Sequence, residues 1–425
     1  MRRRDAVLLI ASNFPPVRGG SAVVYGAIAR RAGGRVHVLA PRRSYVDNLA
    51  LIGWREYDRG TSHPIDRLTL LRTRLNESGG RLPDRLGFVA QDAWLRLRLA
   101  WCVARILATR PIGAICVGEL IHGAWLLRAM RFWPGVRRIA YVHGEEITTE
   151  DDYDPGGARR RRAIAAADRV ITVSRFSAAA IENLAGGGQA AKLRLIGNGV
   201  DYPRFAETAP RRDDLVARYG LDGHFTFVSV CRLLEKKGVD HAIRAFAQLH
   251  ATAPETRLLI VGTGPFALRL AEIARAEHVA DAVIFAGDVP DDELAAHYRL
   301  GDVFVMPNRA MPNGDTEGFG LVFLEANAAG LPVIAGRDGG SGDAVTDGVN
   351  GLVVDGHSVE AIASAMRSLH ADAALRMRLA AAGRVRSMAA DWSVKAASFL
   401  AACLDNEVGA ATEGVISEPV GAGRG

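Results

Sequence analysis

Short apolar runs that alternate with helical stretches constrain the fold of this chain more than any other feature. Ala6–Ile10 is apolar over its full length, and Phe225–Val230 is rich in aromatic and β-branched residues. Strands of this kind are buried on both faces, as in parallel sheets whose crossover helices cover both sides. The alternation continues along the chain, so the sequence predicts an α/β fold with parallel sheets.

A glycine turn leads directly into an apolar helix near residue 320. Gly318 and Gly320 precede an apolar run over 321–329. Free N–H groups at a helix start bind phosphate, and glycine lets a ligand approach the backbone. Glu317 and Glu325 stand on either side, and in one continuous helix they would be about 80° apart around the axis and roughly 12 Å apart along it. We interpret them as two separate hydroxyl acceptors flanking a phosphate, a pattern that suits a nucleotide sugar.

This passage resembles the retaining glycosyltransferases of the GT-B fold, specifically the family 4 group that includes bacterial GDP-mannose-dependent mannosyltransferases. The resemblance implies two Rossmann-like domains that face each other across a cleft. It also implies that Glu317 contacts hydroxyls of the transferred sugar and that Glu325 binds the donor ribose. The backbone amides of Phe319, Gly320 and Leu321 would hold the donor diphosphate.

A basic loop follows the strand Phe225–Val230. It holds Arg232, Lys236 and Lys237, and thus two of the four lysines of the chain. A compact ammonium suits a diphosphate as a point charge, and a guanidinium can fork onto the same oxygens. The family pattern places Arg232 and Lys237 on the diphosphate, although Cys231 stands where the family usually has glycine.

The loop after the first strand carries Pro15-Pro16 and then Gly19-Gly20. Family members commonly have Pro-Pro-x-x-Gly-Gly here. The resemblance therefore implies that Gly19 and Gly20 let this loop close over the donor diphosphate.

His143 follows the predicted strand 138–140 and is the candidate for the catalytic centre, together with Glu317. In the family a His-Gly pair at this strand end meets the transferred sugar, and Glu146 matches a glutamate that often lies three residues further on in the cleft. The implied reaction is retaining transfer without a metal, in which the leaving diphosphate takes the proton of the acceptor hydroxyl. Protein groups would then supply positioning and charge stabilisation.

The residues 262–267 form a Gly-x-Gly-x-x-Ala pattern after a strand, and Asp288 follows the next strand, as in a dinucleotide fingerprint. The pattern occurs in mid-chain after another complete βα unit, whereas a dinucleotide domain usually starts with it. We therefore favour a family turn over an NAD site. The loop after it, with Val289 and Asp291, is expected beside the base of the donor.

Metal and cysteine signals are weak. The acidic stretch 151–154 contains Asp-x-Asp without a second ligand cluster, so we expect a solvated loop or helix start there. The four cysteines form no Cys-x-x-Cys pair, which favours neither zinc nor a disulfide framework. We expect no metal and no cofactor beyond the nucleotide-sugar substrate.

The charge of the chain is unevenly placed. Residues 1–110 hold 20 Arg against 8 Asp and Glu, a net charge of +12, whereas the whole chain carries +6. This imbalance favours an anionic acceptor or an anionic membrane surface on the N-terminal side. The helical stretch 86–108, with Trp94, Leu97 and Trp101, fits either an interfacial helix or a core helix with a solvated arginine face. No nucleic-acid module accompanies the charge.

The chain is too large for one ordinary core, at 425 residues. We expect an N-terminal acceptor domain over 1–202 and a nucleotide-sugar domain over 203–391. A helix over 392–404 would cross back to the first domain, as in the GT-B fold, and 405–425 would form a disordered tail. No apolar run reaches the roughly 20 residues of a spanning helix. The predicted location is the cytoplasm, with peripheral attachment to the inner face of the plasma membrane left open.

Donor and acceptor identities follow only from the resemblance. The stretch 330–351, which includes 339–345, is most similar to enzymes that use GDP-mannose on lipid acceptors, although Gly342 replaces the usual proline. A UDP-sugar donor stays open, and so does the choice between a phospholipid and a lipid-linked oligosaccharide of a surface glycan. The alternatives from other classes are a sugar-nucleotide epimerase, an NAD enzyme and a non-catalytic membrane-binding module.

Overall fold

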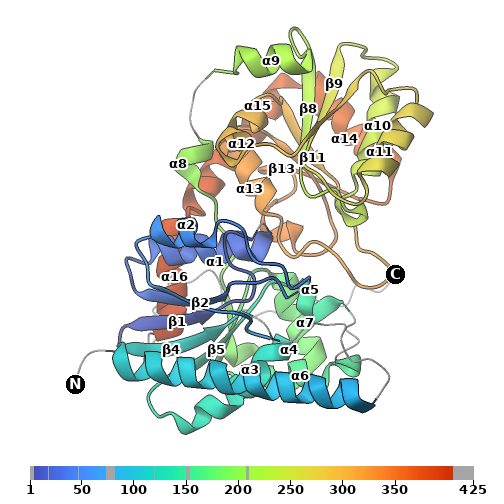
Figure 1. The fold of residues 1–425 in the computed structure, drawn as a ribbon. Helices are drawn as coiled ribbons and strands as arrows, with labels where there is room; N and C mark the ends of the chain where they lie inside the picture. The colour runs from blue at the N-terminus through green and yellow to red at the C-terminus, as the bar shows by residue number, and fades with distance from the viewer. Residues whose placement is uncertain are drawn as a thin grey trace. The chain divides into compact units, whose positions relative to one another are not determined.

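The computed structural model describes residues 4–404 except 18, 46, 73–81, 119, 150–153 and 207–209. The chain divides into two compact units (Figure 1): unit 1 is Met1–Ile196 with Ser393–Gly425, and unit 2 is Gly197–Trp392. The division falls shortly before the limit expected after residue 202. The tail predicted over 405–425 lies outside the described residues.

Unit 1 contains a seven-stranded sheet whose strand pairings are all parallel. In spatial order its strands are β3 (Ile65–Leu68), β2 (Val36–Pro41), β1 (Ala6–Ile10), β4 (Ile112–Val117), β5 (Arg137–Val142), β6 (Arg169–Thr172) and β7 (Leu193–Leu195). Leu8 in the middle of β1 pairs with His37 on one side and Ile115 on the other. The apolar runs of the sequence form the central strands because those strands have a layer on both faces.

Helices cover both faces of this sheet (Figure 1). The α-helices of unit 1 are α1 (Gly20–Arg31), α2 (Trp54–Arg59), α3 (Leu82–Thr109), α4 (Leu120–Ala129), α5 (Glu145–Thr148), α6 (Ala158–Ala166), α7 (Arg175–Ala185) and α16 (Trp392–Leu404), and its 3-10 turns are η1 (Met130–Phe132), η2 (Pro155–Gly157) and η3 (Ala190–Lys192). Strand β5 shows the alternation: Ala140 and Val142 join the core cluster that includes α3, α4 and α6, whereas Tyr141 meets Tyr25 of α1 and Phe399 of α16. The site residues at the end of β5 therefore have a packed base on both faces.

The last helix, α16, belongs to unit 1 from Ser393 onward. Its final carbonyls at Ala402 and Cys403 accept hydrogen bonds from Arg169 and Arg137, at 2.6 and 3.1 Å. Arginine side chains thus satisfy carbonyl groups that a helix end leaves free.

Unit 2 contains a six-stranded parallel sheet. In spatial order its strands are β10 (Val283–Gly287), β9 (Thr256–Val261), β8 (Phe225–Val230), β11 (Val303–Met306), β12 (Val333–Gly336) and β13 (Gly351–Val354). Its α-helices are α8 (Tyr202–Phe205), α9 (Asp213–Tyr219), α10 (Val239–His250), α11 (Ala267–Ala276), α12 (Leu294–Tyr298), α13 (Leu321–Ala328), α14 (Val359–Ala371) and α15 (Ala373–Ala389), and its 3-10 turns are η4 (Glu235–Lys237), η5 (Asp291–Glu293) and η6 (Ser341–Asp343). Helices α10, α11 and α14 lie on one side of the sheet, and α12, α13 and α15 lie on the other (Figure 1).

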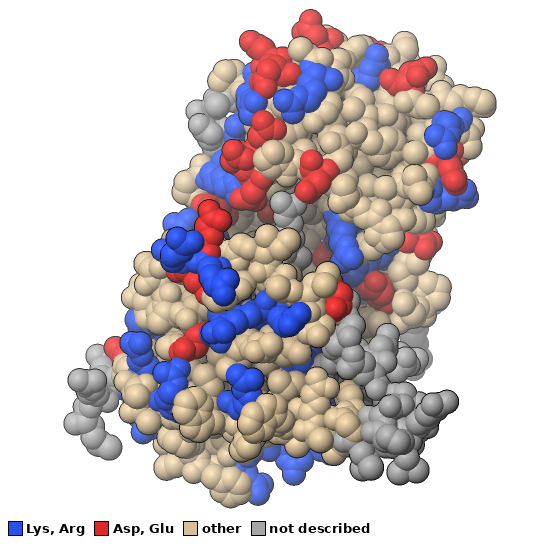
Figure 2. Space-filling model, in the orientation of Figure 1, with Lys and Arg blue, Asp and Glu red and all other residues tan. Residues whose placement is uncertain are grey.

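Charged side chains are distributed differently over the two units. Figure 2 shows mainly Lys and Arg on the visible face of unit 1, whereas both signs mix on unit 2. This agrees with the net charge of +12 over residues 1–110. None of the described helices combines the length and the hydropathy that crossing a bilayer requires.

Candidate active site

The basic loop after β8 meets the glycine turn before α13. The Lys237 ammonium donates to the Glu317 carboxylate, and both side chains are largely buried, at 16 and 13% exposure. Arg232 is exposed, and its side chain has no hydrogen bond or ion pair with any described residue. The fold thus brings two predicted donor-binding residues together from segments 80 positions apart and leaves Arg232 accessible as a second cation.

Lys237 and Glu317 each shift the pKa of the other. Burial raises the pKa of Glu317, but Lys237, Lys236 and the Phe319 amide outweigh burial, so that pKa lies below its ordinary value. Burial lowers the pKa of Lys237, but the Glu317 carboxylate outweighs burial and that pKa is raised. Both groups are therefore charged at neutral pH, although neither is well solvated.

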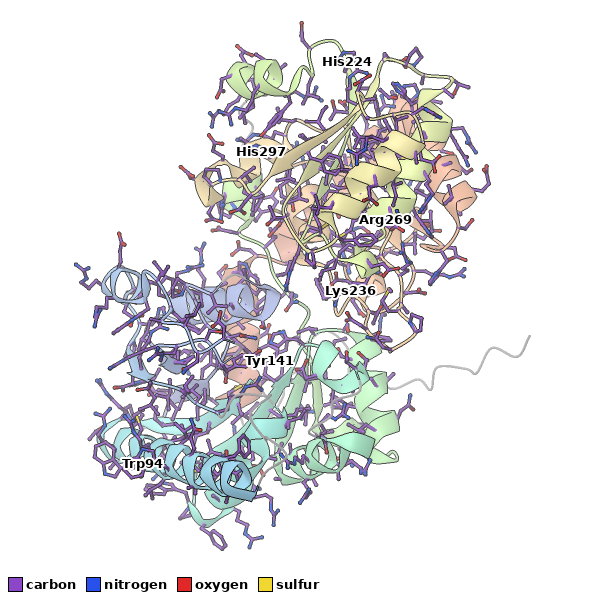
Figure 3. All side chains as sticks on the ribbon, turned by 45° about the vertical axis from the view of Figure 1, so that its right-hand side comes forward. Trp94, Tyr141, His224, Lys236, Arg269 and His297 are labelled. Atoms are coloured by element: carbon purple, nitrogen blue, oxygen red, sulfur yellow. The ribbon has the colours of Figure 1, made fainter. Side chains whose placement is uncertain are left out.

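The neighbouring lysine holds the loop in place. Lys236 donates to Asp315 at 2.6 Å and to the Thr316 carbonyl at 3.3 Å (Figure 3). Its own carbonyl accepts from the Arg309 amide at 2.9 Å, and the Arg309 guanidinium binds Asp240 of α10 at 2.7 and 3.1 Å. These buried ion pairs connect the loops at the ends of β8 and β11.

The glycine turn starts α13 as the sequence predicts. Gly320 has a φ of 86°, and a Cβ there would overlap the Phe323 ring. The Glu317 carbonyl accepts from the Gly340 amide at 2.7 Å, and a Cβ on Gly339 would overlap that carbonyl. Glycine is therefore required at both Gly320 and Gly339. The turn also leaves the first N–H groups of α13 without partners in the helix.

Glu325 lies on α13 in a different environment. Its carboxylate accepts from the Tyr298 hydroxyl at 2.6 Å. Burial raises the pKa of Glu325 and outweighs Tyr298 and Arg204, which lower it. Asp291 is exposed and pairs with Arg204 at 3.2 Å. Val289 is partly buried in the loop between β10 and η5, so the predicted base-side residues and Glu325 belong to neighbouring segments.

The dinucleotide-like glycines have a structural role in unit 2. A Cβ on Gly262 would collide with the Cys231 carbonyl, and one on Gly264 would collide with the Leu233 carbonyl. The Leu233 amide also donates to the Thr263 carbonyl at 2.9 Å. These glycines let the β9 loop pack against the loop that carries Arg232.

His143 lies at the carboxyl end of β5 in unit 1. Its ring stacks on Tyr141 at 4.9 Å between centroids and meets Tyr25 of α1 edge-on at 5.0 Å. Burial lowers the pKa of His143 to about 4. Its Nε2 is inaccessible to solvent and has no hydrogen-bond partner among the described residues. The imidazole is therefore neutral at physiological pH, with one unused polar atom.

The other predicted residues of unit 1 are Glu146, Gly19 and Gly20, and Glu146 contacts His143 directly. The Glu146 carboxylate accepts from the His143 amide at 2.8 Å, so it orients the backbone of the His-Gly turn. Gly19 and Gly20 lie at the start of α1, and a Cβ on either would meet nothing within 4 Å. The open space around both glycines is compatible with a ligand. Arg18, which precedes them, lies outside the described residues.

Asp154 lies at a helix start, as predicted for the acidic stretch, but it is buried rather than solvated. This residue is 2% exposed, accepts from the Arg159 and Arg160 amides at 2.7 and 3.0 Å, and pairs with the Arg160 side chain at 3.1 Å. Arg160 also donates to the carbonyls of Glu146 and Ile147. Asp154 is therefore a buried helix cap that fixes the arginine holding α5. The described residues contain no cluster of three or more potential metal ligands.

Comparisons with known proteins show the family of this chain. Residues 18–204 match the family model "Glycosyltransferase Family 4", and residues 212–386 match "Glycosyl transferases group 1". The chain is a family 4 glycosyltransferase.

Similar relatives of this glycosyltransferase come from mycobacteria. A GDP-mannose-dependent alpha-(1-6)-phosphatidylinositol monomannoside mannosyltransferase of Mycolicibacterium smegmatis is 34% identical over 383 residues, covering 89% of this chain and 92% of the relative. The protein of the same name from Mycobacterium tuberculosis H37Rv is 33% identical over 410 residues, covering 93% and 97%.

Solved structures share the fold of this glycosyltransferase. Anabaena Alr3699/HepE in complex with UDP-glucose has a TM-score of 0.69 at 20% identity, covering 93% of this chain and 98% of that one. WaaG, a glycosyltransferase involved in lipopolysaccharide biosynthesis, has a TM-score of 0.63 at 17% identity, covering 94% and 100%. These structures show the GT-B fold for two Rossmann-like units of seven and six strands.

Sequence reasoning missed several residues that shape the glycosyltransferase site. Tyr298 binds Glu325, Tyr25 packs on His143, and Arg160 holds α5. No local pattern marks these residues, because each acts across a long sequence separation. The arginine run in α6 was a visible signal, but nothing in the sequence singles out Arg160 as its buried member.

Proposed function

We propose that this glycosyltransferase transfers mannose from GDP-mannose to a hydroxyl of a phospholipid acceptor, with retention of the anomeric configuration and without a metal ion. The observation that carries the proposal is the buried Lys237–Glu317 pair beside the glycine turn of α13. The printed names of relatives at 33–34% identity support the GDP-mannose donor and a phosphatidylinositol monomannoside acceptor.

The donor would bind to unit 2 between the two glutamates. Lys237 has ammonium donors beyond the one given to Glu317, so it can contact the diphosphate while Glu317 stays charged and accepts from sugar hydroxyls. Arg232 supplies a second cation, and the amides of Phe319, Gly320 and Leu321 supply donors at the helix start. Glu325, already held by Tyr298, would accept from the ribose.

The acceptor hydroxyl would attack the anomeric carbon from the face that the diphosphate leaves. The new bond joins the acceptor oxygen to that carbon, the bond from the carbon to the phosphate oxygen breaks, and the acceptor proton passes to a phosphate oxygen of GDP. The chain then supplies charge stabilisation through Lys237 and Arg232 and positioning through His143. A neutral His143 suits this role, because a hydrogen bond to the sugar needs no proton exchange.

Thermal stabilisation by nucleotides tests the donor half of the proposal. A ligand at 100 times its dissociation constant adds about 2.7 kcal/mol to the unit that binds it. We expect GDP and GDP-mannose to raise the melting temperature, with UDP, UDP-glucose and NADH as controls. A response to UDP compounds alone would discard mannose, and a response to NADH alone would discard the whole assignment.

Product analysis tests the reaction. We expect GDP-mannose and phosphatidylinositol monomannoside to give GDP and a dimannoside whose new linkage has the anomeric configuration of the donor by NMR, with an undiminished rate in EDTA. An inverted linkage would contradict retention, and a rate that EDTA abolishes and a divalent cation restores would contradict metal independence. Conversion of the donor without any acceptor would indicate an epimerase.

A further inference from the structure

Helix α3 of unit 1 carries two separate apolar faces. Leu95, Leu99, Val103 and Ile106 are buried in the core cluster against the sheet. Trp94, Leu97 and Trp101 are instead 57, 62 and 67% exposed. At 3.6 residues per turn the second set occupies an arc of about 60°, centred roughly 165° from the first. The helix therefore carries a core face, and a second apolar face that is largely exposed in the described structure.

The outer face has a charge pattern of one sign. Arg98 and Arg105 follow Trp94 and Trp101 around the helix by about 40° on one side. Both arginines are exposed, and Arg105 pairs with Asp66 of β3 at 2.9 Å. Figure 3 marks Trp94 on this helix, and Figure 2 shows basic side chains among uncharged surface over the same part of unit 1. Tryptophan and leucine beside arginine are typical of a helix that lies in a membrane interface.

A basic cavity lies on another side of α3, where Arg96 is about 100° around the helix from Leu97. A cavity of about 270 Å³ opens between α3, α4 and α6 and is lined by Arg96, Arg128, Arg159 and Arg162 together with Trp125. Arg96 pairs with Asp92 at 2.6 Å and lies over the Trp125 ring at 5.8 Å. The side chains of Arg128 and Arg159 form no hydrogen bond or ion pair with a described residue, and none of the described residues lining the cavity is acidic.

The cavity lies toward the carboxyl edge of the sheet, the edge that carries His143. Helix α4 begins at Leu120 directly after β4, and α6 begins at Ala158 after β5, so the first turns of both helices are near that edge. Ile121 and Arg159, which line the cavity, belong to those first turns.

We propose that the outer face of α3, made of Trp94, Leu97 and Trp101, docks unit 1 on an anionic phospholipid bilayer and that the arginine cavity between α3, α4 and α6 holds headgroup phosphates of that bilayer. The apolar residues enter the boundary of the acyl chains, while the guanidinium groups of Arg98 and Arg105 and those of the cavity meet the phosphates. Charge complementarity favours an anionic bilayer over a second copy of unit 1, because a second copy would bring arginine against arginine. The inference stands whether or not the donor is GDP-mannose.

Vesicle binding by the full chain tests the apolar face. We expect wild type to bind vesicles of phosphatidylcholine with phosphatidylglycerol more tightly than vesicles of phosphatidylcholine alone. W94S/L97S/W101S should bind the mixed vesicles about tenfold more weakly or worse. The matched control M377S/V385S/M388S removes equally exposed apolar side chains from α15 and should bind like wild type. Equal binding by W94S/L97S/W101S and wild type would overturn the proposal.

The arginine cavity has its own test. R128Q/R159Q should lose about 25-fold in binding to mixed vesicles but little on neutral ones, since each basic residue near an anionic surface contributes roughly fivefold. The control R269Q/R337Q changes two exposed arginines of unit 2 and should retain wild-type binding. If R128Q/R159Q lost stabilisation by inorganic phosphate and kept full vesicle binding, the cavity would be a site for a soluble anion and this part would be wrong.

Fluorescence quenching locates the helix directly. Lipids brominated on the acyl chain should quench wild type, whereas W94F/W101F should still bind vesicles but lose most of the quenching. Unchanged quenching in W94F/W101F would show that another surface enters the bilayer. Stabilisation by GDP, measured on every variant, reports on unit 2, so failure of membrane docking and failure of the proposed donor site give different results.

Discussion

The carboxyl edges of the two sheets have the same topology and opposite chemistry. In unit 2 the edge is built from buried ion pairs, Lys237 with Glu317 and Arg309 with Asp240. In unit 1 it is built from stacked neutral rings around His143, whose pKa lies near 4. A diphosphate needs cations fixed before it arrives, whereas a neutral sugar hydroxyl needs a shaped wall with a few polar atoms.

The two units therefore carry different free-energy penalties at their carboxyl edges. Unit 2 keeps charges out of water, so removing one partner leaves the other unpaired and buried. Unit 1 keeps the Nε2 atom of His143 without a hydrogen bond to any described residue, which is a smaller penalty and one that a ligand can remove. Variants at the two edges should therefore separate into effects on stability with donor binding and effects on turnover.

Lys237→Met should give the largest effect. It leaves the Glu317 carboxylate buried and unpaired, so unit 2 should lose about 3 kcal/mol of unfolding free energy and kcat/KM should fall roughly 100-fold or more. The double variant Lys237→Met with Glu317→Gln should recover part of the stability but none of the activity. Lys192→Met, at an exposed lysine, is the control. Normal activity in the double variant would remove the pair from the donor site.

The same pair predicts the pH dependence of stability. The pKa of Glu317 is lowered below its ordinary value of 4.5, and that of Lys237 is raised above 10.5. The contribution of the pair is therefore complete between these ordinary values. It is lost as pH falls through the lowered pKa of Glu317 or rises through the raised pKa of Lys237. Denaturant titrations at several pH values should show both losses in wild type and neither in the double variant.

Glu325→Gln should separate donor affinity from stability. Loss of a charge-assisted bond to the ribose should raise KM for the donor about tenfold or more. The pKa of Glu325 is raised, so its ionisation lowers the free energy of unfolding as pH rises through that pKa. Glutamine does not ionise and therefore removes this loss. We expect a melting temperature at neutral pH no lower than wild type, with Glu272→Gln on exposed α11 as control. A clear loss of stability would mean that the carboxylate is structural.

His143→Gln should act on turnover alone. The expected change is a fall in kcat of roughly tenfold, the size of one neutral hydrogen bond, with unaltered stabilisation by GDP. The pKa of His143 is about 4. The pH profile of the wild-type rate should therefore have no inflection near pH 6.5 that is missing from the profile of the variant. Such an inflection would assign a proton-transfer role to the imidazole and weaken the contrast between the two edges.

Tyr25→Phe should give the smallest effect. The Tyr25 hydroxyl donates to the Gly118 carbonyl at 3.1 Å, and its ring supports His143. Phenylalanine keeps the ring, so the loss should be about 1 kcal/mol of unfolding free energy with little change in kcat. A large fall in kcat would show that the hydroxyl itself contacts the substrate.

Local patterns predicted the elements of the fold well. The helix predicted from the glycine turn, over 321–329, is α13 (Leu321–Ala328), and the run Phe225–Val230 is β8. Apolar runs and glycine turns act within one segment, so their physics is readable from neighbouring residues. The helix start predicted at Asp154 is confirmed, but its predicted solvation is wrong, because the packing of α6 rather than the acidic stretch supplies Arg160, the partner that buries it.

The sequence by itself determined the parallel α/β architecture, the family and the identities of the candidate donor residues, because apolar periodicity and motif spacing are properties of short segments. Only the tertiary structure decided that Lys237 meets Glu317, that Tyr298 meets Glu325, and that Trp94 and Trp101 face away from the core. These outcomes depend on which strand ends become neighbours and on which side of a helix meets the sheet. A helical repeat places two apolar arcs on α3 but does not state which arc is buried, since that is set by the partner surface and not by the helix.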